Sequence, residues 1–136
     1  MHLRFMLDTN ICIYIAKNQP ECVLHKFENL SVGEVGMSTI TYGELMFGCH
    51  KSKHSKKTKT MIEKLAGLIP ALPIPIEAGN IYGEIRTKLE EVGKPIGNND
   101  LWIAAHAMSM NLTLVSNNLK EFSRIKKLKL DNWVTR

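Results

Sequence analysis

The sequence predicts an α/β fold, a three-layer α/β/α sandwich with a mostly parallel central sheet. Short apolar runs that are typical of buried strands alternate with segments of helical periodicity along the chain. Such alternation favours a parallel sheet with right-handed crossover helices on both faces. The chain has 136 residues, the usual size of one domain, and we expect a single domain over residues 1–136 with no linker.

The composition excludes several other classes of protein. Hydrophobic residues make up 44% of the chain and charged residues 23%, and no apolar run approaches the ~20 residues that a membrane span needs. Charged residues interrupt the N-terminal apolar stretch, and the three cysteines form no close pair. We therefore expect a cytoplasmic protein without a secretory signal, a disulfide scaffold or a membrane contact. The net charge of +5 favours a polyanionic partner.

The first predicted strand ends on an acid. Residues 3–10 read LRFMLDTN, which we interpret as a buried strand that ends at Asp8 and is followed by residues that favour turns and helix caps. Ligands bind at the carboxyl edge of open parallel sheets, because the connecting loops part there. Asp8 is thus a candidate functional residue, although it can also serve only as the cap of a helix over residues 11–16.

A second acid, Glu44, lies in the third predicted helix. Residues 21–37 have the pattern of a helix followed by a short strand, and residues 39–48 form a further predicted helix. In that helix Ile40, Glu44 and Phe47 fall at i, i+4 and i+7, which places Glu44 on or beside the buried stripe. An unpaired carboxylate there would cost several kcal/mol on desolvation. Glu44 must then be paired, solvated in a cleft or bound to a cation, unless it points to water at the margin of the stripe.

Residues 50–60 are rich in lysine and lack apolar periodicity. They are typical of a solvated helix face or loop, and the alternative is a surface that contacts the phosphates of a nucleic acid. The candidate nucleic-acid-binding residues are Lys51, Lys53, Lys56 and Lys57.

Prolines punctuate residues 69–76, which excludes a helix there and allows only a lightly hydrogen-bonded edge strand. Four apolar residues with the spacing of one helix face, from Ile81 to Val92, then predict a helix that Gly93 ends.

The third acid begins the most apolar helix. Residues 101–110 are apolar nearly throughout, which predicts a buried helix. Asp100 lies in its first turn, where the helix dipole favours a negative charge, and capping explains it if no other acid is near. We expect His106, in the same helix, to be a hydrogen-bonded core residue rather than a ligand.

Polar residues also follow the last predicted strand, over residues 112–115. Residues 116–118 and Glu121 carry oxygen atoms that can ligate a cation or accept hydrogen bonds. In a parallel sheet, the ends of the first and last strands and the starts of the helices that carry Glu44 and Asp100 can meet at one edge. The sequence therefore predicts a carboxylate cluster.

Four sequence blocks together resemble one known family. They read MLDTN, TYGEL, PIGNNDLWIAAHA and LVSNNLKEF, at residues 6–10, 41–45, 95–107 and 114–122. In residue type, order and spacing they look like the blocks of PIN-domain ribonucleases, in particular the VapC toxins of bacterial toxin–antitoxin pairs. The resemblance covers nearly the whole chain and implies the PIN-domain sandwich.

The resemblance matches the catalytic, metal-binding acids of the family to Asp8, Glu44 and Asp100. Many PIN domains have a further aspartate where this chain has Asn117 or Asn118, and Glu121 is the other candidate for a fourth ligand. We expect Thr9 and Asn118 to assist by hydrogen bonding. Carboxylates about 4 Å apart repel by roughly 4 kcal/mol per pair at an effective dielectric of 20, and oxygen ligands select Mg²⁺ or Mn²⁺ over Zn²⁺.

Family members are Mg²⁺- or Mn²⁺-dependent endoribonucleases that are held inactive by a small antitoxin, and several of them act on tRNA or other structured RNA. The resemblance therefore implies a Mg²⁺ or Mn²⁺ cofactor, an RNA substrate and a VapB-type antitoxin. It also implies a homodimer and a larger toxin–antitoxin assembly that contacts DNA through the antitoxin.

Two other functions compete with this interpretation. A phosphoacceptor receiver domain also gathers carboxylates at strand ends, but it needs an acidic pair after the first strand, where this chain has Asp8 followed by Thr9 and Asn10. A non-catalytic RNA- or partner-binding module with a degenerate acidic site is the second. Binding of Mn²⁺ would separate a nuclease from such a module.

Overall fold

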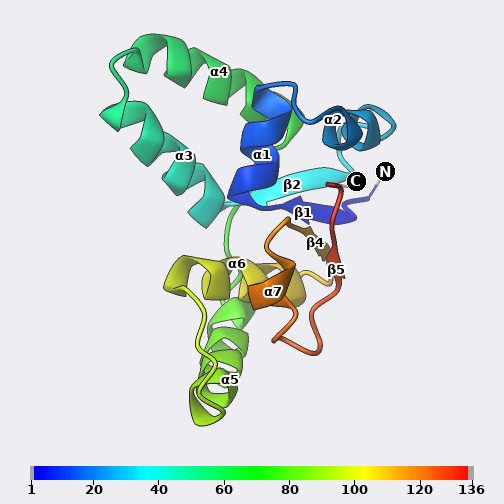
Figure 1. Cartoon of the computed structure of the whole chain (residues 1–136), viewed down its shortest axis with the longest axis vertical. Coiled ribbons are helices and arrows are strands. Elements are labelled where there is room, and N and C mark those ends of the chain that lie inside the picture. The colour runs from blue at the N-terminus through cyan, green and yellow to red at the C-terminus, as the bar shows by residue number, and fades with distance from the viewer. Residues whose placement is uncertain (1, 135–136) are drawn as a thin grey trace.

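The structure is a computed structural model and describes residues 2–134. Its elements, in chain order, are β1 (Phe5–Leu7), α1 (Thr9–Ala16), α2 (Glu21–Glu28), β2 (Val35–Ser38), α3 (Thr39–Lys51), α4 (Ser55–Leu68), β3 (Ala71–Leu72), α5 (Glu77–Glu91), α6 (Asn98–Ser109), β4 (Thr113–Val115), α7 (Leu119–Phe122) and β5 (Leu130–Asp131). In this part of the chain the strands form one sheet in the order β3-β2-β1-β4-β5, and every pair is parallel. Helices α1 to α4 lie on one face and α5 to α7 on the other (Figure 1). The predicted sandwich is confirmed, with a sheet that is parallel throughout.

Neighbouring residues of the central strands point to opposite faces of the sheet. Met6 and Leu114 join an apolar cluster with α5 and α6, whereas Leu7 and Val115 pack with residues of α1 to α4. All four side chains are fully buried, and the register pairs Met6 with Leu114 and Leu7 with Val115. This alternation follows from the two-residue period of a strand, and it fills both interfaces between sheet and helices.

The strand order creates a switch point between β1 and β4. The chain runs from β1 to β2 and β3 on one side, then returns to add β4 and β5 on the other. The loops that leave β1 and β4 therefore diverge, and such a point is where open α/β sheets bind ligands. Asp8 follows β1, and its backbone N–H donates to the carbonyl oxygen of Val115 at the end of β4, at 3.0 Å.

Several predicted elements shift or extend. The lysine-rich residues 50–60 are the end of α3, a short turn and the start of α4, and the helix predicted over residues 101–110 already begins at Asn98. The proline-rich segment does contain an edge strand, β3, as expected. Strand β5 and helix α7 were not predicted, because elements of two and four residues are too short to show a period. Among the described residues no helix is long and apolar enough to cross a membrane.

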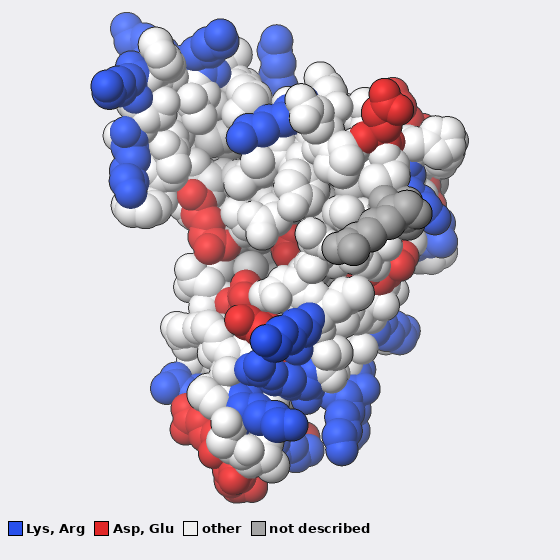
Figure 2. All heavy atoms as spheres, in the orientation of Figure 1, with Lys and Arg blue, Asp and Glu red and all other residues white. Residues whose placement is uncertain are grey.

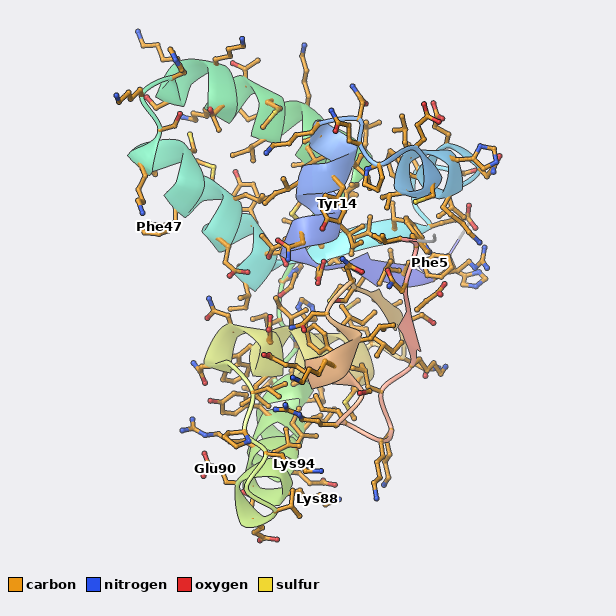
Figure 3. The ribbon with its side chains drawn as sticks, in the orientation of Figure 1. Phe5, Tyr14, Phe47, Lys88, Glu90 and Lys94 are labelled. Atoms are coloured by element: carbon orange, nitrogen blue, oxygen red, sulfur yellow. The ribbon has the colours of Figure 1, made fainter. Side chains whose placement is uncertain are left out.

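The buried face of α3 differs from the predicted one. It is formed by Thr41, Leu45 and Cys49, one position away from the predicted stripe. Phe47, which the prediction placed inside, is 64% exposed and points outward from α3 (Figure 3). The middle of this helix is apolar on several sides, so its spacing alone did not identify the face that packs.

Two local predictions are confirmed by hydrogen bonds. Gly93 has a φ of +69° and follows the C-cap of α5, and the N–H of Lys94 donates to the carbonyl oxygen of Leu89 at 2.9 Å. That pattern is a glycine-terminated helix end. His106 is fully buried with its Nδ1 2.9 Å from the Ser38 hydroxyl, so it is a core residue.

Candidate active site

Asp8 is fixed at the N-terminus of α1. It is only 5% exposed, and its Oδ1 accepts a hydrogen bond from the N–H of Ile11 at 3.0 Å. Burial raises the pKa of this carboxyl group above its ordinary value, and the charge of Glu44 adds to the shift, while hydrogen bonds from Ser116, Ile11 and Asn10 oppose it. Asp8 therefore caps the helix, as its position after a strand suggested, and is also held in an electrostatically unfavourable environment.

Asp100 lies in the first turn of α6, and the charges of all the other acids of the site affect its pKa. Burial is the largest cause that raises its pKa to about 6, followed by the charges of Asp8, Glu121 and Glu44, while a hydrogen bond from Asn118 acts in the opposite direction. These four carboxylates come from the start of α1 and from α3, α6 and α7. Since their charges act on one another, they form one electrostatic site at the switch point.

Glu44 lies beside the buried stripe of α3, and both of its carboxylate oxygens accept hydrogen bonds. The Thr9 hydroxyl donates to Oε1 at 2.5 Å, and the Asn99 amide donates to Oε2 at 3.4 Å. Thr9 also lies 3.4 Å from the hydroxyl of Thr41, which is fully buried. The Glu44 carboxylate is thus oriented from two sides, by the starts of α1 and α6.

The residues after β4 divide into two groups. The Asn118 amide donates to Glu121 Oε2 at 3.4 Å, and the backbone N–H of Asn118 donates to the Ser116 hydroxyl at 2.9 Å. The Asn117 carboxamide instead accepts a hydrogen bond from Asn132 at 3.1 Å, in the C-terminal segment. The structure therefore brings Asn118 and Glu121 to Asp100 and turns Asn117 toward a different partner.

The sequence did not single out two residues of the site: Asn99, and Ser116, which was named only as one of the polar residues 116–118. Asn99 orients Glu44, and the hydroxyl of Ser116 hydrogen-bonds Asp8 and Asn118. Each is a polar residue next to a predicted functional position, at a helix start or a strand end. That adjacency was the available signal, but it could not tell which of several polar neighbours point inward.

The lysines predicted to bind nucleic acid lie away from the acids. Lys51, Lys53, Lys56 and Lys57 are exposed at the turn between α3 and α4, which is the end of α3 distant from the sheet (Figure 1). Figure 2 shows basic side chains at that end and acidic side chains around an indentation in the middle of the same face. The structure therefore separates the two groups.

The donor set of the site consists of oxygen atoms. Within residues 2–134 no three Asp, Glu, His or Cys side chains are close enough together to surround a metal ion jointly. An ion held there would be bound by one or two carboxylates and by water, which is the usual manner in which proteins hold Mg²⁺. The negative charge, the oxygen donors and the raised pKa values of Asp8 and Asp100 all fit such an ion.

The fold and the site together define a class: an α/β protein with a carboxylate site at the switch point of a parallel sheet. Comparison with known proteins identifies the family within this class to which the chain belongs. The sequence profile of the PIN domain matches residues 5–128. Ribonuclease VapC2 of Haemophilus influenzae strain Rd is 42% identical over 132 residues, which cover 97% of this chain and 99% of that protein. The tRNA(fMet)-specific endonuclease VapC of Shigella flexneri is 40% identical over 131 residues, which cover 96% and 98%.

Solved structures agree with these relatives. VapBC-1 from nontypeable Haemophilus influenzae has a chain with 39% identity and a TM-score of 0.90, covering 98% of this chain and all of its own length. VapBC2 from Rickettsia felis, bound to a DNA fragment from its promoter, has a chain with 38% identity and a TM-score of 0.90, covering 97% of this chain and all of its own length. The chain therefore belongs to the PIN-domain family and, within it, to the VapC ribonucleases, as its four sequence blocks predicted.

Proposed function

We propose that this chain is the toxin of a type II toxin–antitoxin pair, an endoribonuclease that hydrolyses phosphodiester bonds of RNA with Mg²⁺ or Mn²⁺. One observation carries the proposal: Asp8, Glu44 and Glu121 come from separate segments, yet their charges add to burial in raising the pKa of Asp100 to about 6. Acids held together against their mutual repulsion mark functional sites, because the fold itself gains nothing from the repulsion. A bound cation would relieve it.

Each acid has a role that fits its surroundings. Asp8 and Asp100, the acids whose pKa values are raised, would hold the ion together with water, and Glu121, positioned by Asn118, would contact it through such a water. A divalent cation supplies a Lewis acid that activates water and offsets the charge developing on the phosphate. The cap of α1 keeps the carboxylate of Asp8 in place, so little reorganisation is needed.

Glu44 would orient the attacking water. Thr9 donates to one of its oxygens and Asn99 to the other, and these two hydrogen bonds restrict the orientation of the carboxylate. A carboxylate so held can accept a hydrogen bond from water and favour in-line attack on a phosphodiester.

Substrate, partners and location follow from the relatives. The Shigella flexneri relative is named as a tRNA(fMet)-specific endonuclease, and we propose tRNA as the substrate of this chain. The structure of VapBC2 from Rickettsia felis contains a bound DNA fragment from its promoter. We accordingly propose a VapB-type antitoxin, a homodimer, a larger assembly that contacts DNA through the antitoxin, and a cytoplasmic location. Lys51, Lys53, Lys56 and Lys57 would contact RNA.

A cleavage assay tests the activity. Purified, antitoxin-free protein is incubated with total bacterial RNA in Mg²⁺, Mn²⁺ or EDTA, and the ends produced are mapped by sequencing. We expect discrete cuts that require the cation and that disappear in Asp8→Asn. Glu63→Gln, which removes an exposed acid of α4, is the matched control and should cut as the wild type does. Cuts of equal rate in Asp8→Asn would refute the assignment of the site, and the absence of all cuts would favour a binding module.

A further inference from the structure

A second basic segment lies at the other end of the sequence. Residues 120–129, called the basic segment here, read KEFSRIKKLK and contain five of the 18 basic residues and one of the 13 acidic residues, a local charge of +4. Apart from the lysine-rich turn between α3 and α4, no other segment of the sequence is so densely basic. The basic segment was not among the predicted nucleic-acid-binding residues.

The backbone of the basic segment is anchored while its cations face outward. Phe122, Ile125 and Leu128 are 0%, 6% and 8% exposed and pack into the cluster beneath the sheet. Four of the five cations are exposed, and they alternate with these anchors; they are Lys120, Lys126, Lys127 and Lys129. The basic charge is therefore held on a fixed surface rather than on a freely moving loop.

Among residues 2–134, no acidic side chain forms an ion pair with a cation of the basic segment. The ion pairs within residues 2–134 join Arg4 to Glu34, Arg86 to Glu90 and Lys88 to Glu84. Arg124, the remaining cation, donates instead to the carbonyl oxygen of Pro95 at 2.9 Å, in the loop that leads to α6. These charges are consequently available to an external anion.

The basic segment adjoins the acidic site. Glu121 belongs to the segment and acts on the pKa of Asp100, and Lys120 is its neighbour in α7. Arg124 ties the segment to the loop before the helix that carries Asp100. Figure 2 shows basic side chains over α7 and the loop that follows it, directly below the acidic indentation. The acids therefore lie between this surface and the lysine-rich turn.

We infer that the basic segment binds the sugar-phosphate backbone of the substrate RNA next to the acidic site. A phosphate that enters a group of carboxylates is repelled by them, so the strand must be held by cations on the flanking surface. Such cations also steer the substrate toward the acids. The inference rests on the proposed ribonuclease function. It adds that the RNA strand passes over the basic segment, which begins in α7.

The salt dependence of RNA binding tests the inference. Fluorescently labelled, unfractionated tRNA is bound to Lys126→Gln/Lys127→Gln, in EDTA and at several KCl concentrations, with anisotropy as the readout. The control is Lys17→Gln/Lys26→Gln, which removes the same charge from exposed positions on the other side of the sheet. In the variant of the basic segment, we expect about tenfold weaker binding at low salt and a slope of log affinity against log salt that is smaller in magnitude by about 1 to 2. The control variant should show neither change.

Several outcomes would overturn the inference. Equal losses in both double variants would mean that net charge rather than position matters, and no loss in the variant of the basic segment would mean that the RNA runs elsewhere. A loss confined to a mixed-sequence DNA duplex, measured in parallel, would make the surface a DNA contact. Binding is measured in EDTA, without cleavage, so these results are independent of the nuclease assay. The variant of the basic segment can show weaker RNA binding even if the wild-type protein cuts no RNA.

Discussion

Asp8 combines a structural role, the cap of α1, with the metal-binding role that we propose for it. Its Oδ1 caps α1, while the group as a whole is buried beside the charge of Glu44, and burial raises its pKa. A cap requires only an oxygen that accepts a hydrogen bond, and metal binding requires the negative charge. The two tasks can therefore be separated by substitution at this one residue.

Asp8→Asn should fold as well as the wild type while losing RNA cleavage. Asparagine is as good a cap as aspartate, and the substitution removes a buried charge, so the free energy of unfolding without metal should stay within about 1 kcal/mol of the wild type or rise. Asp8→Ala also loses the cap and should be about 1 kcal/mol less stable than Asp8→Asn. Urea unfolding of the three proteins measures both differences. A large loss of stability in Asp8→Asn would show that the charge itself holds the fold together.

Asp100 should make the stability of the metal-free protein depend on pH. Its folded-state pKa is about 6 and its ordinary value is 3.8, so the folded protein binds this proton more tightly than the unfolded chain does. The contribution of Asp100 to stability therefore increases as the pH falls through 6, and it is complete below 3.8. Thermal unfolding in EDTA from pH 7.5 to pH 5 should show this gain in the wild type relative to Asp100→Asn.

The comparison with Asp100→Asn is needed because other groups titrate in the same range. Burial lowers the pKa of His106, for example, and this favours the folded state at higher pH. His106 titrates in both proteins, so the difference between the two pH profiles reports on Asp100 and on the acids coupled to it. Parallel profiles would contradict the environment described for Asp100.

At the scale of elements, the close approach of two strands constrains a single residue. Gly36 is buried in β2, and a Cβ atom there would lie 2.8 Å from Leu72 Cδ1 and 3.2 Å from the carbonyl oxygen of Pro70. The pairing of β2 with the edge strand β3 thus depends on the absence of a side chain. This pairing fixes the start of α3, since Ser38 ends β2 and caps that helix.

Gly36→Ala should therefore destabilise the fold by about 1–3 kcal/mol, the usual cost of overpacking. Gly79→Ala in α5 is the matched control, because the added Cβ would meet no atom within 4 Å apart from the adjoining residues and backbone of its own helix. Alanine favours a helix over glycine by up to about 1 kcal/mol, so this control should be neutral or stabilising. Denaturant unfolding of both variants measures the difference, and equal effects in the two would contradict the packing of β2 against β3.

At the scale of the whole molecule, the acidic site couples distant parts of the chain. Its residues belong to the start of α1 and to α3, α6 and α7, and they include helices from both faces of the sheet. Their mutual repulsion opposes this assembly in the absence of a cation. An ion that binds only the assembled site would stabilise the entire fold by mass action.

Mn²⁺ should accordingly raise the melting temperature of the wild type. At a concentration 100 times its dissociation constant, a ligand of the folded state adds about 2.7 kcal/mol. Asp100→Asn should lose this stabilisation, and Glu63→Gln should keep it, because Glu63 is exposed on α4 and outside the site. Scanning calorimetry with and without Mn²⁺ provides the measurement. A shift that persists in Asp100→Asn would place the cation elsewhere.

Local patterns in the sequence were sufficient for the α/β class, and four sequence blocks were sufficient for the family. The same patterns made Asp8, Glu44 and Asp100 candidates, and the metal-binding role given to them stays a prediction. A strand that runs into a polar residue, a cap at a helix start and a glycine at a helix end each depend on a few neighbouring residues. Such features can be predicted from the sequence because residues that are near one another in the chain determine the backbone conformation at these positions. Asp8 and Gly93 are examples whose local geometry the structure confirms.

Only the tertiary structure decided which polar groups meet. It turned Asn117 to Asn132, brought Asn118 and Glu121 to Asp100, and paired Glu44 with Thr9 and Asn99. It also selected the buried face of α3 and added β5 at the edge of the sheet. The physical reason is that these contacts join residues 15 to 55 positions apart through strand order and helix packing. Local periodicity carries no information on that arrangement.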